Sequence, residues 1–284
     1  MAEYAIMTNS TCDLPEEMIK ELELDVLALG INIGDETYKH IPIQDFYQKI
    51  REGALPTTNA ANIGEYTDAF EAILQEGKDI LCLTFSSALS TTHNSAVLAA
   101  QELAEKYPDR KIFVVDTLCA SAGEGLLAWH AVQQKRSGKT IEEVRDWVES
   151  NKLKLAHWFT VNDLDHLKRG GRISATRALM GSMLGIKPIL HVNNEGRLVP
   201  ADKVRGRQAS LTRILEQVKN TGQDLSDLTV FISHSDCYDE AKALADQIKD
   251  ELGVKDVQVS YIGPVIGSHT GIGTIAVFFL ASER

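Results

Sequence analysis

Short apolar runs alternate along the chain with longer stretches in which apolar residues recur every three or four positions. The short runs predict β-strands and the longer stretches predict amphipathic helices. In the first half the expected strands are residues 4–9, 26–33, 79–85 and 111–116, with 38–41 completing a hairpin. The expected helices there are residues 43–52, 63–75, 92–106, 120–135 and 141–151. This alternation is typical of a mostly parallel sheet with helices on both faces.

The second half has a different pattern. Its expected strands are residues 154–161, 187–192, 197–204, 228–234 and 273–280, and its expected helices are 208–219 and 239–252. The segment Asn193-Asn194-Glu195-Gly196 predicts a tight turn between two antiparallel strands. We therefore expect an α/β protein of two domains. Residues 1–155 would form an N-terminal domain with a mostly parallel sheet, and residues 156–284 a C-terminal α/β domain with a mixed or antiparallel sheet.

Three helix starts have the spacing of a capping box, in which a polar residue is followed three positions later by glutamate. The pairs are Asp13 and Glu16, Asn62 and Glu65, and Thr140 and Glu143. Each first residue is expected to cap its helix.

The charge of the chain restricts its partners. Its 284 residues carry a net charge of -11, which argues against broad nucleic-acid binding and against a DNA-binding regulator, because phosphate neutralisation needs a basic surface. The distribution is uneven, since residues 168–213 contain ten Lys or Arg and two acidic residues. This basic segment is either a docking or phosphate-facing surface or an ordinary solvated face.

The sequence contains no apolar run of the roughly 20 residues that a membrane-spanning helix needs. Its first residues have no basic stretch of the kind that opens a secretory signal, so we expect a soluble cytoplasmic protein. The cysteines form no CxxC pair and the histidines no HxxxH pair, which favours inert thiols and predicts neither a metal nor a cofactor. These cysteines are Cys12, Cys82, Cys119 and Cys237.

Three polar segments are candidates for chemistry. Residues 56–60 form a polar loop before a capped helix, which is either a plain turn or part of a site. Residues 86–95 place many hydroxyls between a strand and a helix, where free N–H groups favour an anion. Residues 263–273 contain four glycines around His269, a pattern expected to bend tightly and present the imidazole.

Together these segments resemble the DegV family, nearly end to end. The matching motifs, in chain order, are Asn9-Ser10-Thr11-Cys12-Asp13, Thr57-Thr58-Asn59, Ser86-Ser87-Ala88-Leu89-Ser90, Gly170-Gly171-Arg172-Ile173-Ser174, Lys187-Pro188-Ile189 and Ser268-His269-Thr270-Gly271. The chain departs from the family at Asn9, where an acidic residue is usual, at Asn59, where a longer amide is commoner, and at Thr91, where glycine is frequent.

The resemblance implies a function and a set of site residues. Characterised members are bacterial fatty-acid-binding subunits of a fatty-acid kinase, so the implied ligand is a long-chain fatty acid in an apolar tunnel. Its carboxylate would be held by Thr57, Ser90 and His269, with Thr58 and Thr91 beside them. The kinase would convert the bound acid to an acyl phosphate for phospholipid synthesis, and the carrier itself would not be an enzyme. Transient contact with a membrane is compatible with this role.

The basic segment then gains a role as a surface that faces the partner or the transferred phosphate. The residues proposed for it are Lys168, Arg169, Arg172, Arg205 and Arg207. A tail of roughly 15 methylenes, at about 0.8 kcal/mol each, would supply most of the affinity. The hydroxyls and one imidazole would hold the head group without a permanent cation.

Two alternatives use the same residues. Ser90 and His269 could be nucleophile and base of a stand-alone hydrolase or acyl transferase, although the chain has no GxSxG elbow. The same polar residues could also bind another anionic amphiphile, since any carboxylate fits them.

Overall fold

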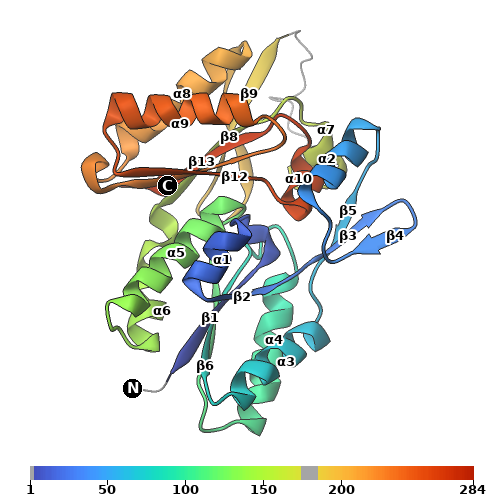
Figure 1. Cartoon of the computed structure of the whole chain (residues 1–284), viewed down its shortest axis with the longest axis vertical. Coiled ribbons are helices and arrows are strands. Elements are labelled where there is room, and N and C mark those ends of the chain that lie inside the picture. Colours follow the sequence, from blue (N-terminus) through green and yellow to red (C-terminus); the bar gives the residue numbers. More distant parts are fainter. Residues whose placement is uncertain (1–2, 174–184) are drawn as a thin grey trace.

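The computed structural model describes residues 3–173 and 185–284, whose strands form two large sheets and one small sheet (Figure 1). The first large sheet is parallel throughout, with the order β2-β1-β6-β7. Its strands are β1 (Tyr4–Asn9), β2 (Leu24–Leu27), β6 (Asp79–Thr84) and β7 (Ile112–Asp116). The expected strand at 26–33 is in fact two strands, because the chain leaves this sheet after Leu27.

Alternate residues of β1 explain how helices come to cover both faces of the first sheet. Tyr4 and Ile6 pack in one apolar cluster with α1 (Glu16–Leu22), α5 (Ala122–Arg136) and α6 (Ile141–Asn151). Ala5 and Met7 pack in another cluster with α3 (Ile63–Gln75) and α4 (Thr92–Lys106). The period of two along the strand thus separates the two layers of helices.

The second large sheet is mixed, with the order β10-β9-β8-β13-β11-β12. Only β11 and β12 pair in parallel, and the remaining neighbours are antiparallel. Its strands are β8 (Leu155–Thr160), β9 (Ile186–Val192), β10 (Leu198–Arg205), β11 (Thr229–His234), β12 (Asp256–Tyr261) and β13 (Ile275–Leu280). The helices α8 (Arg207–Thr221) and α9 (Tyr238–Leu252) pack on one of its faces.

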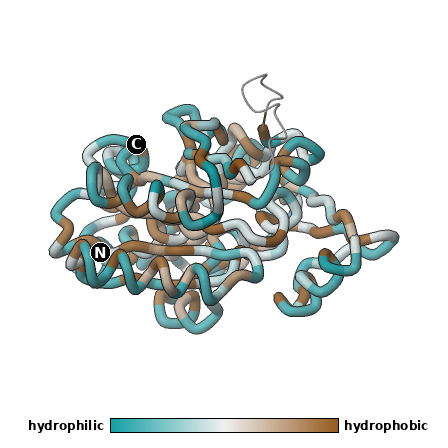
Figure 2. The backbone as a smooth tube through the Cα atoms, turned by 90° about the horizontal axis from the view of Figure 1, so that it is seen from above, coloured by the Kyte–Doolittle hydropathy of each residue, from teal (hydrophilic) through white to brown (hydrophobic). Residues whose placement is uncertain are grey.

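Helix α5 packs against both large sheets. Its residues share one apolar cluster with Leu81 of the first sheet and with Phe231 and Phe278 of the second. In Figure 2 brown apolar stretches follow the inner strands, while teal polar residues lie mostly on the outer turns. The two sheets therefore have a common interior between them.

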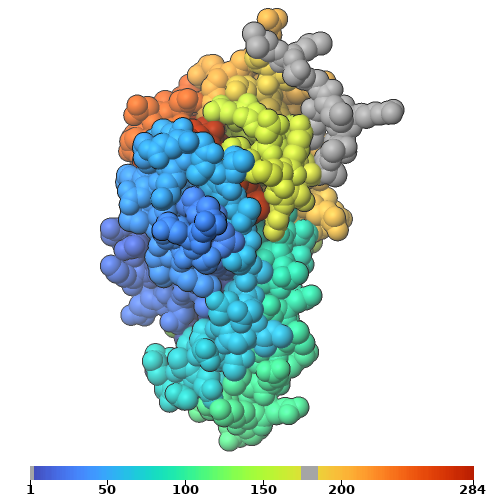
Figure 3. All heavy atoms as spheres, turned by 90° about the vertical axis from the view of Figure 1, so that its right-hand side faces the viewer, coloured from blue at the N-terminus to red at the C-terminus, as the bar shows by residue number. Residues whose placement is uncertain are grey.

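The small sheet, with the order β4-β3-β5, projects from the side of the molecule (Figure 1). It contains β3 (Gly30–Ile33), β4 (Glu36–Tyr38) and β5 (Thr57–Asn59), and α2 (Ile43–Arg51) connects β4 to β5. Figure 3 faces this side, where the blue residues around α2 lie against the yellow-green residues near 165.

The predicted α/β class, with a parallel and a mixed sheet, is confirmed, whereas the division at residues 155 and 156 stays a prediction. Two of the three predicted capping boxes form, at Asn62 and Thr140. The third prediction is wrong, because Pro15 occupies the cap position of α1 and the carboxylate of Asp13 binds elsewhere. Ser174 and Arg177, which belong to a motif and to the basic segment, lie outside the described residues.

Candidate functional site

A cavity of about 580 Å³ lies between the two large sheets and the small sheet. This volume is in the range of 300–1,000 Å³ that small-molecule sites usually have. All three predicted polar segments contribute to its lining, through Thr58, Ser90 and His269 among others. Residues from the predicted loops are thus brought to one place, although they are far apart in the sequence.

Helix α10 (Pro264–Thr270) forms one long wall of the cavity. The lining residues on and just before this helix are Ile262, Val265, Ile266, His269 and Thr270. Their spacing of three and four residues is that of a single helical face. His269 at the end of the helix and Ile262 before its start therefore lie at opposite ends of this wall. The sequence had predicted a tight bend here rather than a helix.

The polar end of the cavity is built around His269. Its Nε2 lies 2.8 Å from the hydroxyl of Thr58, which β5 supplies. The other ring nitrogen, Nδ1, has no partner among the residues that the structure describes. We therefore assign the ring proton to Nε2, which donates to Thr58 and leaves the Thr58 hydroxyl proton free for a ligand oxygen.

Burial and nearby cations keep this imidazole neutral. Burial, and after it the charges of Arg172 and Arg169, together lower the pKa of His269 from 6.5 to about 4. The ring packs tightly against Gly170, where an added Cβ would lie 2.2 Å from Nδ1. This contact gives a physical reason for a glycine at the start of the Gly170-Gly171-Arg172 motif.

Ser90 lies at the start of α4, on the same polar side of the cavity. Its Oγ accepts from the backbone N–H of Thr92 at 3.2 Å and contacts the Thr92 hydroxyl at 2.8 Å. Because Thr92 is fully buried and can donate to Ser90, the Ser90 proton is available to a ligand. The N–H groups of the first helical turn add a positive electrostatic potential beside it. Thr91, the preceding residue, also lines the cavity.

Arg172 is the cation of this end, which corrects the expectation that the head-group site lacks one. Its Nε donates to the carbonyl of Leu89 at 3.2 Å and its Nη1 to the carbonyl of Gly170 at 2.5 Å. Burial lowers the pKa of the guanidinium from its usual value. Since Arg172 lines the cavity, its positive charge can attract an anion bound there.

The other predicted residues lie elsewhere. Thr57 is exposed and is not part of the lining, because strand alternation turns it to the opposite side of β5 from Thr58. Arg205 is exposed at the end of β10, and Arg207 forms an ion pair with Glu240 at 2.5 Å. Neither arginine contributes to the cavity lining.

The rest of the cavity is mainly apolar. The second sheet supplies a floor in which Phe159 pairs with Ala276 and His157 with Phe278. The other apolar lining residues are Leu29, Ala60, Phe85, Ala88, Leu89, Ala120, Leu167, Val192 and Leu198, besides those of α10. The strand pattern gave no sign of these positions, because it shows which residues are buried but not which ones border a void.

His157 is a polar residue in this floor, yet its hydrogen bonds are already used. Its Nδ1 lies 2.9 Å from the carbonyl of Leu155, and its Nε2 accepts from the N–H of Ala120 at 3.3 Å. Burial moves the pKa of His157 well below 6.5, so the ring is neutral. Its edge meets the ring of Phe278 at 5.2 Å between centroids. His157 and Phe278 therefore present a mainly hydrocarbon surface to the cavity, because both ring nitrogens of His157 already have partners.

The geometry gives little support to a hydrolase. Among the described residues, the hydroxyl of Ser90 contacts Thr92 and the imidazole of His269 contacts Thr58, so the two are not hydrogen-bonded to each other. A nucleophile and its base need such a contact.

No cluster of three or more His, Cys, Asp or Glu could hold a metal ion within residues 3–173 and 185–284. None of the helices in these ranges is long and apolar enough to cross a membrane. Three of the four cysteines are buried, and Cys237 is half-buried.

Comparisons with known proteins agree with this fold. Residues 3–282 match the family model described as "Uncharacterised protein, DegV family". A DegV domain-containing protein of Clostridium perfringens is 47% identical over 289 aligned residues, which cover 100% of this chain and 99% of the relative.

Two solved structures extend the likeness to proteins with known ligands. A DegV family protein from Thermus thermophilus, described by its fatty acid binding, superposes with a TM-score of 0.89 at 32% identity and covers 99% of this chain and 100% of its own. DegV from Bacillus subtilis, described as a fatty acid binding protein, gives a TM-score of 0.87 at 28% identity with the same coverage. The chain therefore belongs to the DegV family.

Proposed function

We propose that the protein binds a long-chain fatty acid in the cavity, with the carboxylate at the polar end and the tail along α10. The observation that carries the proposal is the division of one cavity into two parts. Thr58, Ser90 and His269 gather at one end, and a hydrocarbon wall lines the rest. The fatty acids bound by the Thermus thermophilus and Bacillus subtilis proteins support the same ligand class.

The head group is held by donors. The hydroxyls of Thr58 and Ser90 each have a proton free for a carboxylate oxygen, and the N–H groups at the start of α4 add further positive potential. Arg172 supplies the compensating charge, which an anion removed from water requires. His269 acts through Thr58, by orienting its hydroxyl.

The tail supplies the affinity. Each buried methylene contributes about 0.8 kcal/mol, so roughly 15 methylenes offer about 12 kcal/mol before the costs of association and ordering are subtracted. Because both ring nitrogens of His157 in the floor already have partners, an unsubstituted hydrocarbon fits there better than a hydroxylated one.

We further propose that a fatty-acid kinase takes the bound acid as its substrate and forms an acyl phosphate that feeds phospholipid synthesis. In this role the protein is a non-catalytic carrier in the bacterial cytoplasm. Arg172 supports the proposal because it borders the cavity, and Arg205 because it is an exposed cation on the same basic segment. Unchanged acyl-phosphate formation with the kinase and ATP in both Arg172→Ala and Arg205→Ala would overturn this part.

Mass spectrometry of the purified protein tests the binding itself. We expect one fatty acid per chain in the native spectrum, and its release into organic solvent. The double variant Ser90→Ala, His269→Ala should lose most of it. The matched control is Ser95→Ala, His40→Ala, which removes a serine and a histidine outside the cavity lining.

A protein that purifies without ligand and also refuses added fatty acids would exclude the carrier function. Turnover of a generic ester that depends on Ser90 would instead favour the hydrolase. Tight binding of a different carboxylic acid, with fatty acids excluded, would favour another amphiphile.

A further inference from the structure

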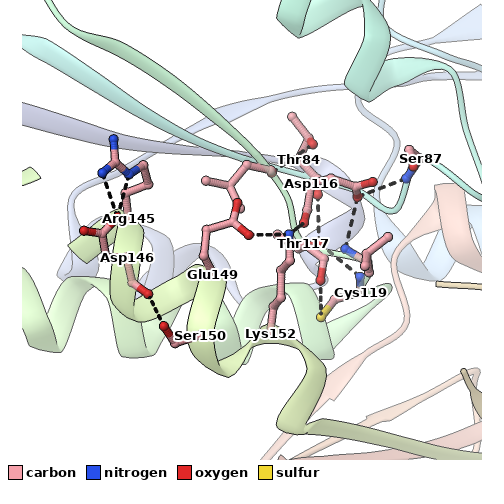
Figure 4. Close-up of polar contacts among 12 residues, drawn as sticks. Thr84, Ser87, Asp116, Thr117, Cys119, Arg145, Asp146, Glu149, Ser150 and Lys152 are labelled. Atoms are coloured by element: carbon pink, nitrogen blue, oxygen red, sulfur yellow. Dashed lines mark hydrogen bonds and ion pairs between the residues drawn. The ribbon is translucent and has the colours of Figure 1, made fainter. Parts of the chain in front are cut away.

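The loop of residues 86–91, which carries Ser90, is tied to the end of the neighbouring strand by one carboxylate. Asp116 is the last residue of β7, and its Oδ1 accepts from the backbone N–H of Ser87 at 3.1 Å and from that of Leu118 at 3.1 Å (Figure 4). Leu118 has a positive φ of 53°, which a leucine rarely adopts. Asp116 thus joins two loops and stabilises the strained one.

The chain around Asp116 is itself fixed on several sides. Thr117 donates its hydroxyl to the carbonyl of Thr84 at 2.8 Å, and the N–H of Ser86 donates to the carbonyl of Cys119 at 3.1 Å. From the turn that directly follows α6, Lys152 donates to the main-chain carbonyl of Asp116 at 2.9 Å (Figure 4). The position of the carboxylate is therefore set by both β6 and the end of α6.

The hydrogen bond between Ser87 and Asp116 also restricts the position of Ser90 in the head-group site. The N–H groups of Leu89 and Ser90 both bond the carbonyl of Ser86, so the loop is one tight turn. Displacement of Ser87 would move the Ser90 hydroxyl and the start of α4 together. Asp116 is not part of the cavity lining, so any effect it has on a ligand must be transmitted through this loop.

We propose that Asp116 is a positioning residue of the carboxylate site, which holds the loop of residues 86–91 so that Ser90 and the start of α4 face the head group. The inference rests on the proposed function, since it assumes that a carboxylate binds there. As an acid near an anion site, Asp116 repels the ligand. Its benefit must therefore come from the geometry it imposes, and this distinction can be tested.

The test compares two probes with the same tail, palmitic acid and hexadecanol, in equilibrium binding to the full chain. Asp116→Ala should weaken binding of the acid by about tenfold, the usual effect of losing one hydrogen bond to a charged group, and should change binding of the alcohol less than about twofold. Asp116→Asn should restore most of the loss, because its amide oxygen can accept both N–H groups. Asp146→Ala, an exposed acid on α6 in the same view, is the control and should change neither affinity (Figure 4).

If Asp116→Ala binds the acid and the alcohol more weakly by the same factor, Asp116 only supports the fold. If its affinities for both equal those of wild type, Asp116 does not position the loop. Either result overturns the proposal. A wild-type protein that binds the alcohol as tightly as the acid would instead refute carboxylate recognition, and with it this inference. If Asp116→Ala does not fold, Asp116→Asn and Asp116→Glu decide. The proposal requires Asp116→Glu, which keeps the charge but displaces the carboxylate, to bind the acid more weakly than wild type, while Asp116→Asn, which keeps the geometry, binds it about as tightly as wild type.

Discussion

Glu124 is a carboxylate that folding removes completely from water. It lies in the first turn of α5, between the two large sheets, and is 0% exposed. The hydroxyls of Thr8 and Thr11 donate to its two oxygens at 2.8 and 2.7 Å, and the N–H of Asn9 donates at 3.3 Å. Burial outweighs these bonds and raises the pKa of Glu124 from 4.5 to about 8. At neutral pH the native side chain is therefore mostly protonated.

This raised pKa makes the stability of the protein depend on pH. Between pH 4.5 and about 8 the native state keeps a proton that the unfolded chain releases, so this group lowers stability as pH rises through that window. Glu124→Gln cannot ionise, and its stability relative to wild type should increase across the window by at most about 1.4 kcal/mol per pH unit. Outside the window the difference should be constant.

Urea unfolding of wild type and Glu124→Gln from pH 4 to pH 9 measures this difference. Glu102→Gln, which changes an exposed carboxylate on α4, is the control and should follow wild type at every pH. A Glu124→Gln difference that does not vary with pH would show that Glu124 is ionised in the native state.

At the scale of elements, the sequence predicted best where the signal is local. The capping boxes at Asn62 and Thr140 form because both partners are within one turn. Asp13 has the same spacing, but its carboxylate instead accepts from the Ser121 hydroxyl at 2.6 Å and from the N–H of Gly263 at 2.9 Å. These partners are more than a hundred residues away, and nothing in the local pattern indicates them.

Three further elements were not predicted, because their sequence patterns are weak. The helix α10 is short and contains a glycine, which disfavours helix, although Pro264 at its first position is a helix-start signal that could have revealed it. The edge strand β12 is only half-buried, so its apolar alternation at Val257, Val259 and Tyr261 is the one sequence clue. Helix α7 (Asp165–Arg169) has five residues, too few to show a period.

The strand β13 allows a prediction about chain length. Phe278 and His157 close the floor of the cavity, and α5 packs directly on them, since a Cβ at Gly123 would lie 2.2 Å from His157 Nε2. We expect the end of the fatty-acid tail to contact Phe278 and His157. Phe278→Leu should therefore shift binding towards longer fatty acids, by up to about fourfold for each additional methylene that fits, the equivalent of ~0.8 kcal/mol.

The next residue provides a matched control. Phe279 is also buried, but it faces the cluster with α8 and α9 on the opposite side of the sheet. Phe279→Leu makes the same change without enlarging the cavity, and its preference for chain length should equal that of wild type. The measurement is competition among saturated fatty acids of increasing length. The same shift in both variants would mean that general loosening, rather than the wall at Phe278, sets the length.

At the scale of the whole molecule, the cavity lies where the sheets are joined. Asp13 connects the start of α5 to the start of α10, and burial raises its pKa from 3.8 to about 7. Tyr47 of α2 donates to the carbonyl of Ile262 at 2.7 Å. The alternation of strands and helices was enough to predict the two sheets. Their contact depends on pairs far apart in sequence, so the cavity between them could be expected only from resemblance to a family.

This placement predicts that a bound fatty acid stabilises both sheets together. At a free concentration of one hundred times Kd, binding contributes about 2.7 kcal/mol. That corresponds to a rise in Tm of roughly 5 °C, since an unfolding entropy of about 2.1 cal/mol/K per residue gives a shift of slightly under about 2 °C per kcal/mol in a chain of 284 residues. The fluorescence of two tryptophans can follow the unfolding of the two sheets separately. Trp147 lies on α6 beside the first sheet, and Trp158 lies on β8 of the second.

Variants that keep only one of these tryptophans should therefore show equal shifts in Tm when the fatty acid is added. The Ser90→Ala, His269→Ala protein should show almost none at the same ligand concentration, which controls for detergent-like effects of the lipid. A shift at Trp158 with none at Trp147 would mean that the ligand stabilises only the second sheet. The polar end would then be held by α10 and Arg172, and the contribution of Ser90 and α4 to binding would be negligible.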